Sequence, residues 1–186
     1  MPLHVLATGR GLTVAAELGL PVVVGGPLLG LAGDPAPGLA ALADYRRAFR
    51  PSPEQPEPRV AVSVDVLVAD TAAEAADLLL PEAWAMARAR TEGAFPPLET
   101  VAAVRAASWT VRQREYVERS RAGAVAGTPA QVASRLAELL ERTGAAELVA
   151  SSSTFDRAAL AASDAALAQL VVESGSAAAM ASPSRP

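Results

Sequence analysis

The stretch HVLATGRGLTVAAELGLPVVVGG, from His4 to Gly26, constrains the fold most, because it holds a strand, a helix and a second strand in one short run. An apolar strand over Leu3–Thr8 leads through a Gly-Arg-Gly turn into a helix over Thr13–Gly19, and a β-branched strand follows over Leu20–Val24. Two strands joined by one helix are typical of a βαβ unit, whose strands are parallel and whose crossover is right-handed. We therefore expect a parallel sheet with flanking helices.

The clearest single strand is RVAVSVDVLVADT, which begins at Arg59. Every second residue from Val60 to Val68 is valine, whereas Ser63 and Asp65 fall on the opposite face. If the valines pack against helices, Ser63 and Asp65 line the inner face of the sheet. A buried carboxylate there needs an arginine or hydrogen-bond donors. We expect Asp65 to form a structural ion pair rather than to act as an acid or base.

Helix starts are marked by three capping boxes, in which a threonine is followed three residues later by Glu or Gln. They are Thr71–Glu74, Thr110–Gln113 and Thr128–Gln131. Pro81 should break or kink the first of these helices. The other expected elements are helices over Ala40–Phe49 and Arg157–Val172, a strand over Glu147–Ser151, and irregular segments over Gly25–Gly38 and Pro51–Pro58. The sequence thus predicts four parallel strands in one domain, 1–172, followed by a disordered tail, 173–186.

Composition narrows the classes of partner and site. A net charge of −4 gives no sign of the positively charged surface that binds nucleic acid. With no cysteine and with His4 as the only histidine, a transition-metal site is not expected, and His4 is interpreted as a packed or surface residue. The start of the chain lacks the pattern of a secretory signal, and the longest apolar runs have the length of strands. We expect a cytoplasmic protein without a membrane span.

Three segments together resemble the C-terminal half of the bacterial luciferase-like, flavin-dependent monooxygenases. These segments are Ala7–Pro21, Val60–Ala75 and Val125–Asp156. In that family they form strands five to eight of a (β/α)8 barrel, so the resemblance implies an α/β half-barrel in which the first four strands are absent. A whole barrel typically needs about 250 residues. Because half a barrel leaves its inner face and two edges uncovered, we expect a homodimer or a complementary half-barrel chain.

The turn Thr8-Gly9-Arg10-Gly11 is the candidate binding site. It follows a strand and precedes a helix, so backbone amides, the helix dipole and the Arg10 guanidinium would all favour an anion. In the resembling family this turn helps to hold the phosphate of FMN, with a hydroxyl at the position of Thr8. The resemblance therefore implies that Thr8, Gly9, Arg10 and Gly11 bind FMN. The alternative is an ordinary βα turn that needs glycine for its dihedral angles.

Two departures from the family pattern bear on activity. Ala7 and Gly11 stand where such enzymes often carry further hydroxyl or carboxylate groups. This predicts weaker binding of the phosphate than in those enzymes. Gly25-Gly26-Pro27 occupies the place of aromatic or histidine side chains near the flavin ring, and no catalytic residue is identified. A further polar run, Ser151–Thr154, follows the last strand. It could bind a phosphate or a carbonyl group, but we interpret it as a loop that caps the final helix.

Two functions follow from the resemblance. The first is a flavin-dependent monooxygenase that uses reduced FMN and O2 on a small organic substrate. The second is a non-catalytic flavin-binding or assembly module that keeps the scaffold of the family; a remnant without its own function is the third possibility.

Overall fold

The structure is a computed structural model that describes residues 3–181, with side-chain surroundings through residue 172. The chain divides into two compact units. Unit 1 comprises Met1–Val66, Ala122–Val125 and Arg135–Ser151, and unit 2 comprises Leu67–Arg121, Ala126–Ser134 and Ser152–Pro186.

A parallel sheet forms the centre of unit 1. Its strands are β1 (Val5–Ala7), β2 (Val22–Gly25), β3 (Val60–Val68) and β5 (Glu147–Ser151). β1 pairs with β2, β2 with β3 and β3 with β5, each time in the parallel direction. The predicted fold class, an α/β half-barrel with a parallel sheet, is confirmed. The structure adds a short strand that the sequence does not predict, β4 (Val125–Gly127), which lies next to β3 in the strand order.

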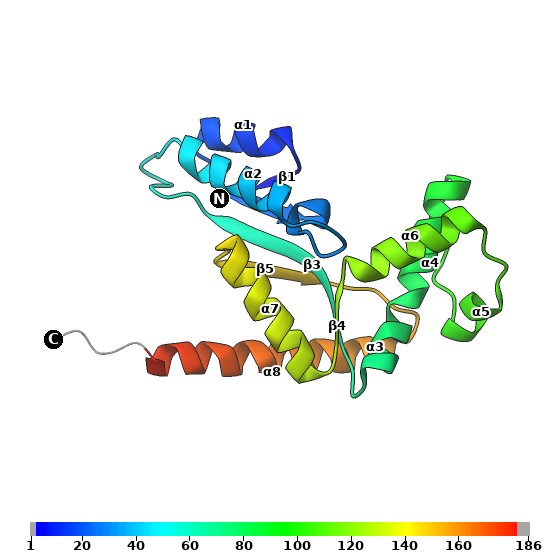
Figure 1. The fold of residues 1–186 in the computed structure, drawn as a ribbon. Helices are drawn as coiled ribbons and strands as arrows, with labels where there is room; N and C mark the ends of the chain where they lie inside the picture. The colour runs from blue at the N-terminus through cyan, green and yellow to red at the C-terminus, as the bar shows by residue number, and fades with distance from the viewer. Residues whose placement is uncertain (1–2, 182–186) are drawn as a thin grey trace. The chain divides into compact units, whose positions relative to one another are not determined.

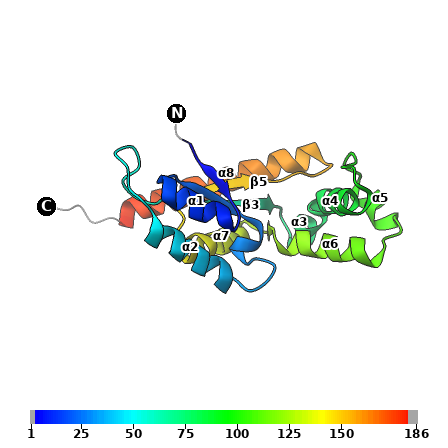
Figure 2. The same ribbon diagram turned by 90° about the horizontal axis from the view of Figure 1, so that it is seen from above.

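The valine face of the sheet is buried against helices, as the alternation predicts. Val22 lies level with Val60 and Val24 with Val62, and all four side chains are buried. Helices α1 (Arg10–Leu18) and α2 (Ala36–Ala48) pack against each other over these strands (Figure 1); Figure 2 views the same pair of helices from above. Burial of branched apolar side chains between sheet and helices is the main source of stability in this unit.

The opposite face of the sheet is partly exposed. Leu6 of β1 is level with Val23, and Val149 of β5 is level with Ser63. Leu6 is 78% exposed and Val149 is 47% exposed, although the small Ala61 on this face is buried. Large apolar side chains on a sheet face are normally covered in parallel sheets, so this face lacks part of its cover within the described chain.

Polar side chains on the helices of unit 1 donate hydrogen bonds to backbone carbonyls of other segments. The Arg46 guanidinium of α2 donates to the carbonyl of Thr143 at 2.5 Å, at the end of α7 (Pro129–Thr143). Arg142 donates to the carbonyl of Leu29 at 2.6 Å, at the end of the 3-10 helix η1 (Gly26–Leu29). The buried Tyr45 hydroxyl donates to the carbonyl of Leu20 at 2.9 Å, and burial raises the pKa of this phenol. These bonds satisfy carbonyls at element ends that would otherwise lack partners.

Unit 2 is built mainly from helices, which are α3 (Ala72–Leu78), α4 (Leu80–Glu92), α5 (Val101–Ala106), α6 (Val111–Ala122) and α8 (Arg157–Ala181). Trp84 of α4 lies in an apolar cluster with Val104 of α5 and Val117 of α6. The Trp84 ring stacks on Trp109 with centroids 5.2 Å apart, and the Trp109 indole donates to the carbonyl of Val104 at 2.9 Å. Trp84 therefore fills core space in this unit, and Trp109 packs against it.

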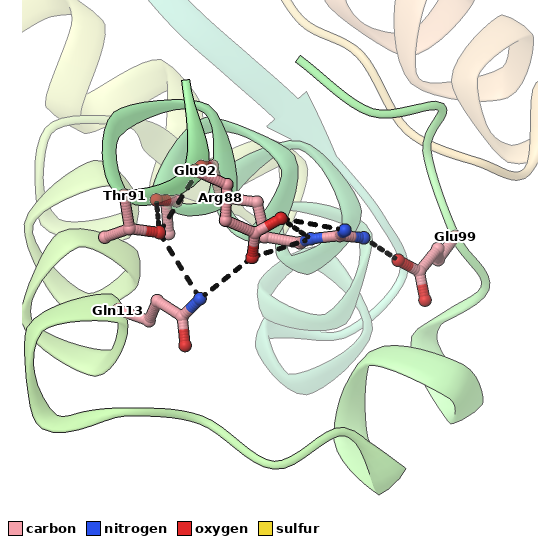
Figure 3. A network of polar contacts seen from close by, with 6 residues as sticks. Arg88, Thr91, Glu92, Glu99 and Gln113 are labelled. Carbon is pink, nitrogen blue, oxygen red and sulfur yellow. Dashed lines mark hydrogen bonds and ion pairs between the residues drawn. The ribbon is translucent and has the colours of Figure 1, made fainter. Parts of the chain in front are cut away.

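A polar network joins α4 to α6 and to the segment before α5 (Figure 3). Arg88 contacts Glu92 at 2.9 Å and Glu99 at 3.1 Å. The Gln113 amide nitrogen lies 3.3 Å from the Thr91 hydroxyl and 3.3 Å from a Glu92 carboxylate oxygen. Hydrogen bonding to Glu92 is the largest cause that raises the pKa of Arg88, so this guanidinium stays charged and keeps both carboxylates engaged.

Two of the three predicted capping boxes form in full, and at Thr71–Glu74 only the threonine hydroxyl bond forms. The hydroxyls of Thr71, Thr110 and Thr128 accept from the amides three residues later, and the Gln113 and Gln131 side chains bond back to the threonine amides. Pro81 lies in the first turn of α4, where its missing N–H costs nothing, so the predicted break is confirmed.

Three predicted helices differ from the structure in their boundaries. α1 begins at Arg10 rather than Thr13, and α2 begins at Ala36 rather than Ala40, inside the segment that was expected to be irregular. α8 continues to Ala181 rather than ending at Val172. Residues 173–181 were expected to belong to a disordered tail, but their alanine-rich sequence favours helix. The remainder of the expected tail, 182–186, lies outside the described residues.

Gly38 of α2 lies directly against the backbone of Leu28 in η1. A Cβ atom added to Gly38 would collide with the carbonyl oxygen of Leu28, whereas one on Gly33 would meet nothing within 4 Å. We expect Gly38→Ala to lower the free energy of unfolding by about 1–3 kcal/mol, because overpacking forces the backbone to shift. Urea denaturation followed by circular dichroism measures this, with Gly33→Ala as the matched control. Equal stabilities of the two variants would show that α2 does not pack on η1 as described.

Candidate functional site

The candidate turn lies between β1 and α1. β1 ends at Ala7, Thr8 and Gly9 form the turn, and α1 begins at Arg10. Thr8, Gly9 and Arg10 are exposed and Gly11 is half-buried. The earlier helix start places Arg10 and Gly11 in the first helical turn, where an anion is favoured by the helix dipole.

The two glycines of this turn have different roles. Gly9 has φ +53°, which L-residues rarely adopt, and a Cβ added there would meet nothing within 4 Å. A Cβ on Gly11 would lie 3.5 Å from the Cβ of Ala7, an ordinary contact. Gly9 is therefore required by the backbone and leaves open space above it, whereas Gly11 is not required on steric grounds.

The amides of this turn are only partly available to a ligand. The Gly11 amide donates to the Thr8 carbonyl at 3.1 Å, and the Leu12 amide donates to the Gly9 carbonyl at 3.2 Å. No side chain caps α1, so the Thr8 hydroxyl is not used for capping. Over the described residues, no hydrogen bond or ion pair engages the Arg10 guanidinium. An anion at this position would therefore contact mainly Thr8, Gly9 and Arg10.

Other polar groups lie at the same edge of the sheet. Since the β1–β2, β2–β3 and β3–β5 pairs are all parallel, the carboxyl ends of β1, β2, β3 and β5 meet at one edge. Asp65 of β3 is level with Ser151 of β5, and the Ser151 hydroxyl donates to the Asp65 carboxylate at 3.0 Å. The expected ion pair of Asp65 was therefore wrong: among the described residues its partner is a hydroxyl from the neighbouring strand.

The Gly25-Gly26 pair after β2 has a steric cause. A Cβ on Gly25 would lie 2.9 Å from the carbonyl oxygen of Ser63, so the backbones approach too closely for a larger residue. η1 then begins at Gly26, directly after the strand. This corner of the sheet therefore presents backbone, with no aromatic or histidine side chain from residues 25–27.

Two residues singled out by the sequence lie away from this edge. His4 is exposed and precedes β1, at the opposite end of the strand. In the run after β5, Ser153 donates its amide to Glu82 at 3.0 Å, and Asp156 accepts from the amides at the start of α8. The final helix is thus capped by Asp156 and not by the serine run, which corrects our interpretation.

Two kinds of feature are missing from the part of the chain that the structure describes. No group of three or more His, Asp or Glu side chains could hold a metal ion there. No helix within it has the length and apolar character needed to cross a membrane.

The sequence matches the family described as luciferase-like monooxygenase over residues 1–147. The chain belongs to the luciferase-like monooxygenase family. Its relative YvbT, an uncharacterized protein of Bacillus subtilis (strain 168), is 27% identical over 155 residues, which are 82% of this chain and 44% of YvbT.

Solved structures agree with this family in fold. The crystal structure of apo-MsnO8 superposes with a TM-score of 0.70 at 25% identity, covering 91% of this chain and 51% of MsnO8. The long-chain alkane monooxygenase LadA gives a TM-score of 0.54 at 15% identity, covering 92% of this chain and 41% of LadA. The coenzyme F420-dependent tetrahydromethanopterin reductase of Methanopyrus kandleri gives 0.53 at 16% identity, covering 84% and 47%. The chain thus spans about half the length of these relatives.

The different roles of Gly9 and Gly11 are directly testable. We expect Gly9→Ala to lower the free energy of unfolding by about 1–2 kcal/mol, because a side chain is strained at positive φ. Gly11→Ala should leave stability unchanged or raise it by up to about 1 kcal/mol, because alanine favours the helix. Thermal or urea denaturation of both variants measures the difference. A large loss for Gly11→Ala would contradict the described start of α1.

Proposed function

We propose that this chain contributes the phosphate-binding side of a flavin site in a luciferase-like monooxygenase that acts on a small organic substrate. The observation that carries the proposal is the exposed turn at the start of α1, in which the exposed Arg10 directly follows the open backbone of Gly9. Membership of the luciferase-like monooxygenase family supports the same assignment. Such a turn suits the phosphate of FMN, since it combines a helix N-terminus with a charge-assisted donor.

Each residue of the turn would make a different contribution to phosphate binding. The Thr8 hydroxyl would donate one hydrogen bond, and Arg10 would supply two parallel N–H bonds and a positive charge. Gly9 admits the phosphate close to the backbone, because no side chain fills the space above it. Gly11 would contribute through the dipole of the first helical turn, since its own amide is bonded to Thr8. Reduced FMN, when bound, supplies the reaction with O2.

The remaining wall of the site would come from outside the described sheet. The exposed Leu6 and Val149 lie on the face that lines the interior in a closed barrel, and the chain spans about half of its relatives. We propose that a second copy or a complementary half-barrel chain covers this face. Its strands would exclude water from the flavin, which a half-barrel cannot do alone.

A non-catalytic flavin-binding or assembly module is the second candidate function. It is favoured by the corner after β2, where Gly25, Gly26 and Pro27 offer no group for proton transfer or ring stacking. The close approach of Gly25 to Ser63 keeps a larger side chain out of this position. The two candidates therefore share the phosphate-binding turn and differ in whether a catalytic group lies opposite it.

Titration of the purified chain with FMN, followed by quenching of flavin fluorescence, tests the shared part. We expect saturable binding that the Thr8→Ala/Arg10→Ala double variant weakens about tenfold or more, because hydrogen bonds to charged groups contribute about 1.5–3 kcal/mol each. Arg47→Ala is the control, since Arg47 is an exposed arginine of unit 1 that pairs with Asp44 on the surface of α2.

Three results separate the possibilities. No binding below millimolar FMN would remove both candidate functions for the chain on its own. Equal affinity of the wild type and the double variant would show that the phosphate is held elsewhere. If the chain binds FMN but does not turn over reduced FMN when O2 is present, the result would favour the non-catalytic module.

A further inference from the structure

A second group of cationic side chains lies in unit 2, around Tyr116 of α6. The Cζ atoms of Arg90, Arg112 and Arg119 lie 5.3, 5.7 and 5.8 Å from the centre of the Tyr116 ring. The ring packs with its apolar body against the Trp84 cluster and is half-buried. Arg90 comes from α4, and the other two arginines come from α6. We call these four residues the arginine–tyrosine cluster.

The positive charge of this cluster is not neutralised by carboxylates. Among the ion pairs of the described residues, none includes Arg90, Arg112 or Arg119. The acidic side chains at the same end of α4 are engaged elsewhere, because Arg88 holds both Glu92 and Glu99 (Figure 3). Glu115 and Glu118 lie on α6 as well, but neither forms an ion pair with these arginines.

Three like charges held around one ring raise the local electrostatic potential. The Tyr116 phenol reports this potential, since a hydrogen bond from Arg112 and the charges of Arg112, Arg90 and Arg119 lower its pKa. Arg112 lies 3.3 Å from the phenol oxygen. A group that stabilises negative charge on a phenolate will also stabilise a bound anion.

The supporting structure fixes the two helices that carry these arginines. Gln113, beside Arg112, bonds to Thr91 and Glu92 of α4, and the buried Val117 packs in the cluster with Trp84. The two helices that carry the arginines are therefore held in place before a ligand binds. This lowers the conformational entropy that is lost on binding. A guanidinium that lies over an aromatic ring keeps the N–H groups of its edge free to donate.

We propose that the arginine–tyrosine cluster is a binding site for a phosphoryl group. Convergence of guanidinium groups suits phosphate, because each arginine can donate two parallel hydrogen bonds to its oxygens. The site lies in unit 2, whereas the β1–α1 turn lies in unit 1, so this proposal does not depend on the proposed flavin site. The phosphoryl group comes either from inorganic phosphate or from a phosphate ester, and the experiment distinguishes these sources.

The two tyrosines of the chain make the site measurable by absorbance. The pKa of Tyr45 is raised and that of Tyr116 is lowered, so the first tyrosinate to form near 295 nm belongs to Tyr116, and it should vanish in Tyr116→Phe. At constant ionic strength, we expect phosphate to raise the pKa of Tyr116 by about 0.5 units or more relative to chloride, because a bound anion offsets the arginine charges. The increase should saturate with phosphate concentration.

Variants identify the arginines responsible. Arg90→Gln/Arg112→Gln should abolish the response to phosphate, whereas Arg114→Gln, an exposed arginine of α6 that does not contact the Tyr116 ring, should retain it. Far-ultraviolet circular dichroism establishes that each variant is folded. A response to phosphate alone supports a site for the free anion, and an equal or stronger response to adenosine monophosphate supports a site for phosphate esters.

Two outcomes would overturn the proposal. The first is an identical Tyr116 pKa in phosphate and in chloride. The second is an equal response in Arg114→Gln and in the double variant, which would show that screening or net charge, and not Arg90 and Arg112, decides the shift. Because the wild-type chain alone decides the first outcome, the test does not depend on whether the variants fold.

Discussion

The packing of the β2 and β3 valines against α1 and α2 is the interaction on which the rest of unit 1 depends. It buries Val22, Val24, Val60 and Val62 on one face of a parallel sheet. Parallel sheets are normally covered on both faces, yet Leu6 and Val149 remain exposed on the other. The same packing orients the carboxyl ends of the strands toward one edge, where the Thr8–Gly9 turn and the Asp65–Ser151 hydrogen bond lie. The candidate site and the uncovered face of the sheet are therefore both consequences of the same parallel arrangement of strands.

Regular patterns in the sequence predicted the parts of the fold that repeat along the chain. The valine alternation of Val60–Val68 fixed which face of β3 is buried, and the threonine capping boxes located the starts of α3, α6 and α7. Both signals act between residues close in sequence, so no knowledge of distant contacts was needed. The strand β4, at Val125–Gly127, was not predicted because it holds a single large apolar residue, Val125, followed by Ala126 and Gly127.

The details of the site depended on contacts that a sequence does not display. α1 begins at Arg10 without a capping side chain, so no local signal marks its start. The partner of Asp65 is Ser151, far along the chain, and only the register of β3 and β5 brings the two together. Arg90 meets Tyr116 in the same way, through the packing of α4 on α6. Long-range pairing decides these contacts, and it follows from the tertiary fold.

Accessibility of single cysteines tests the central claim most directly, because the chain has no cysteine of its own. Leu6→Cys and Val149→Cys report on the uncovered face, while Val24→Cys and Val62→Cys report on the face beneath the helices. At a concentration where sedimentation shows a monomer, the first pair should react rapidly with a thiol reagent and the second pair slowly. The first pair should become protected when the chain associates with a second copy or a complementary half-barrel. Equal protection of all four cysteines in the monomer would contradict the account.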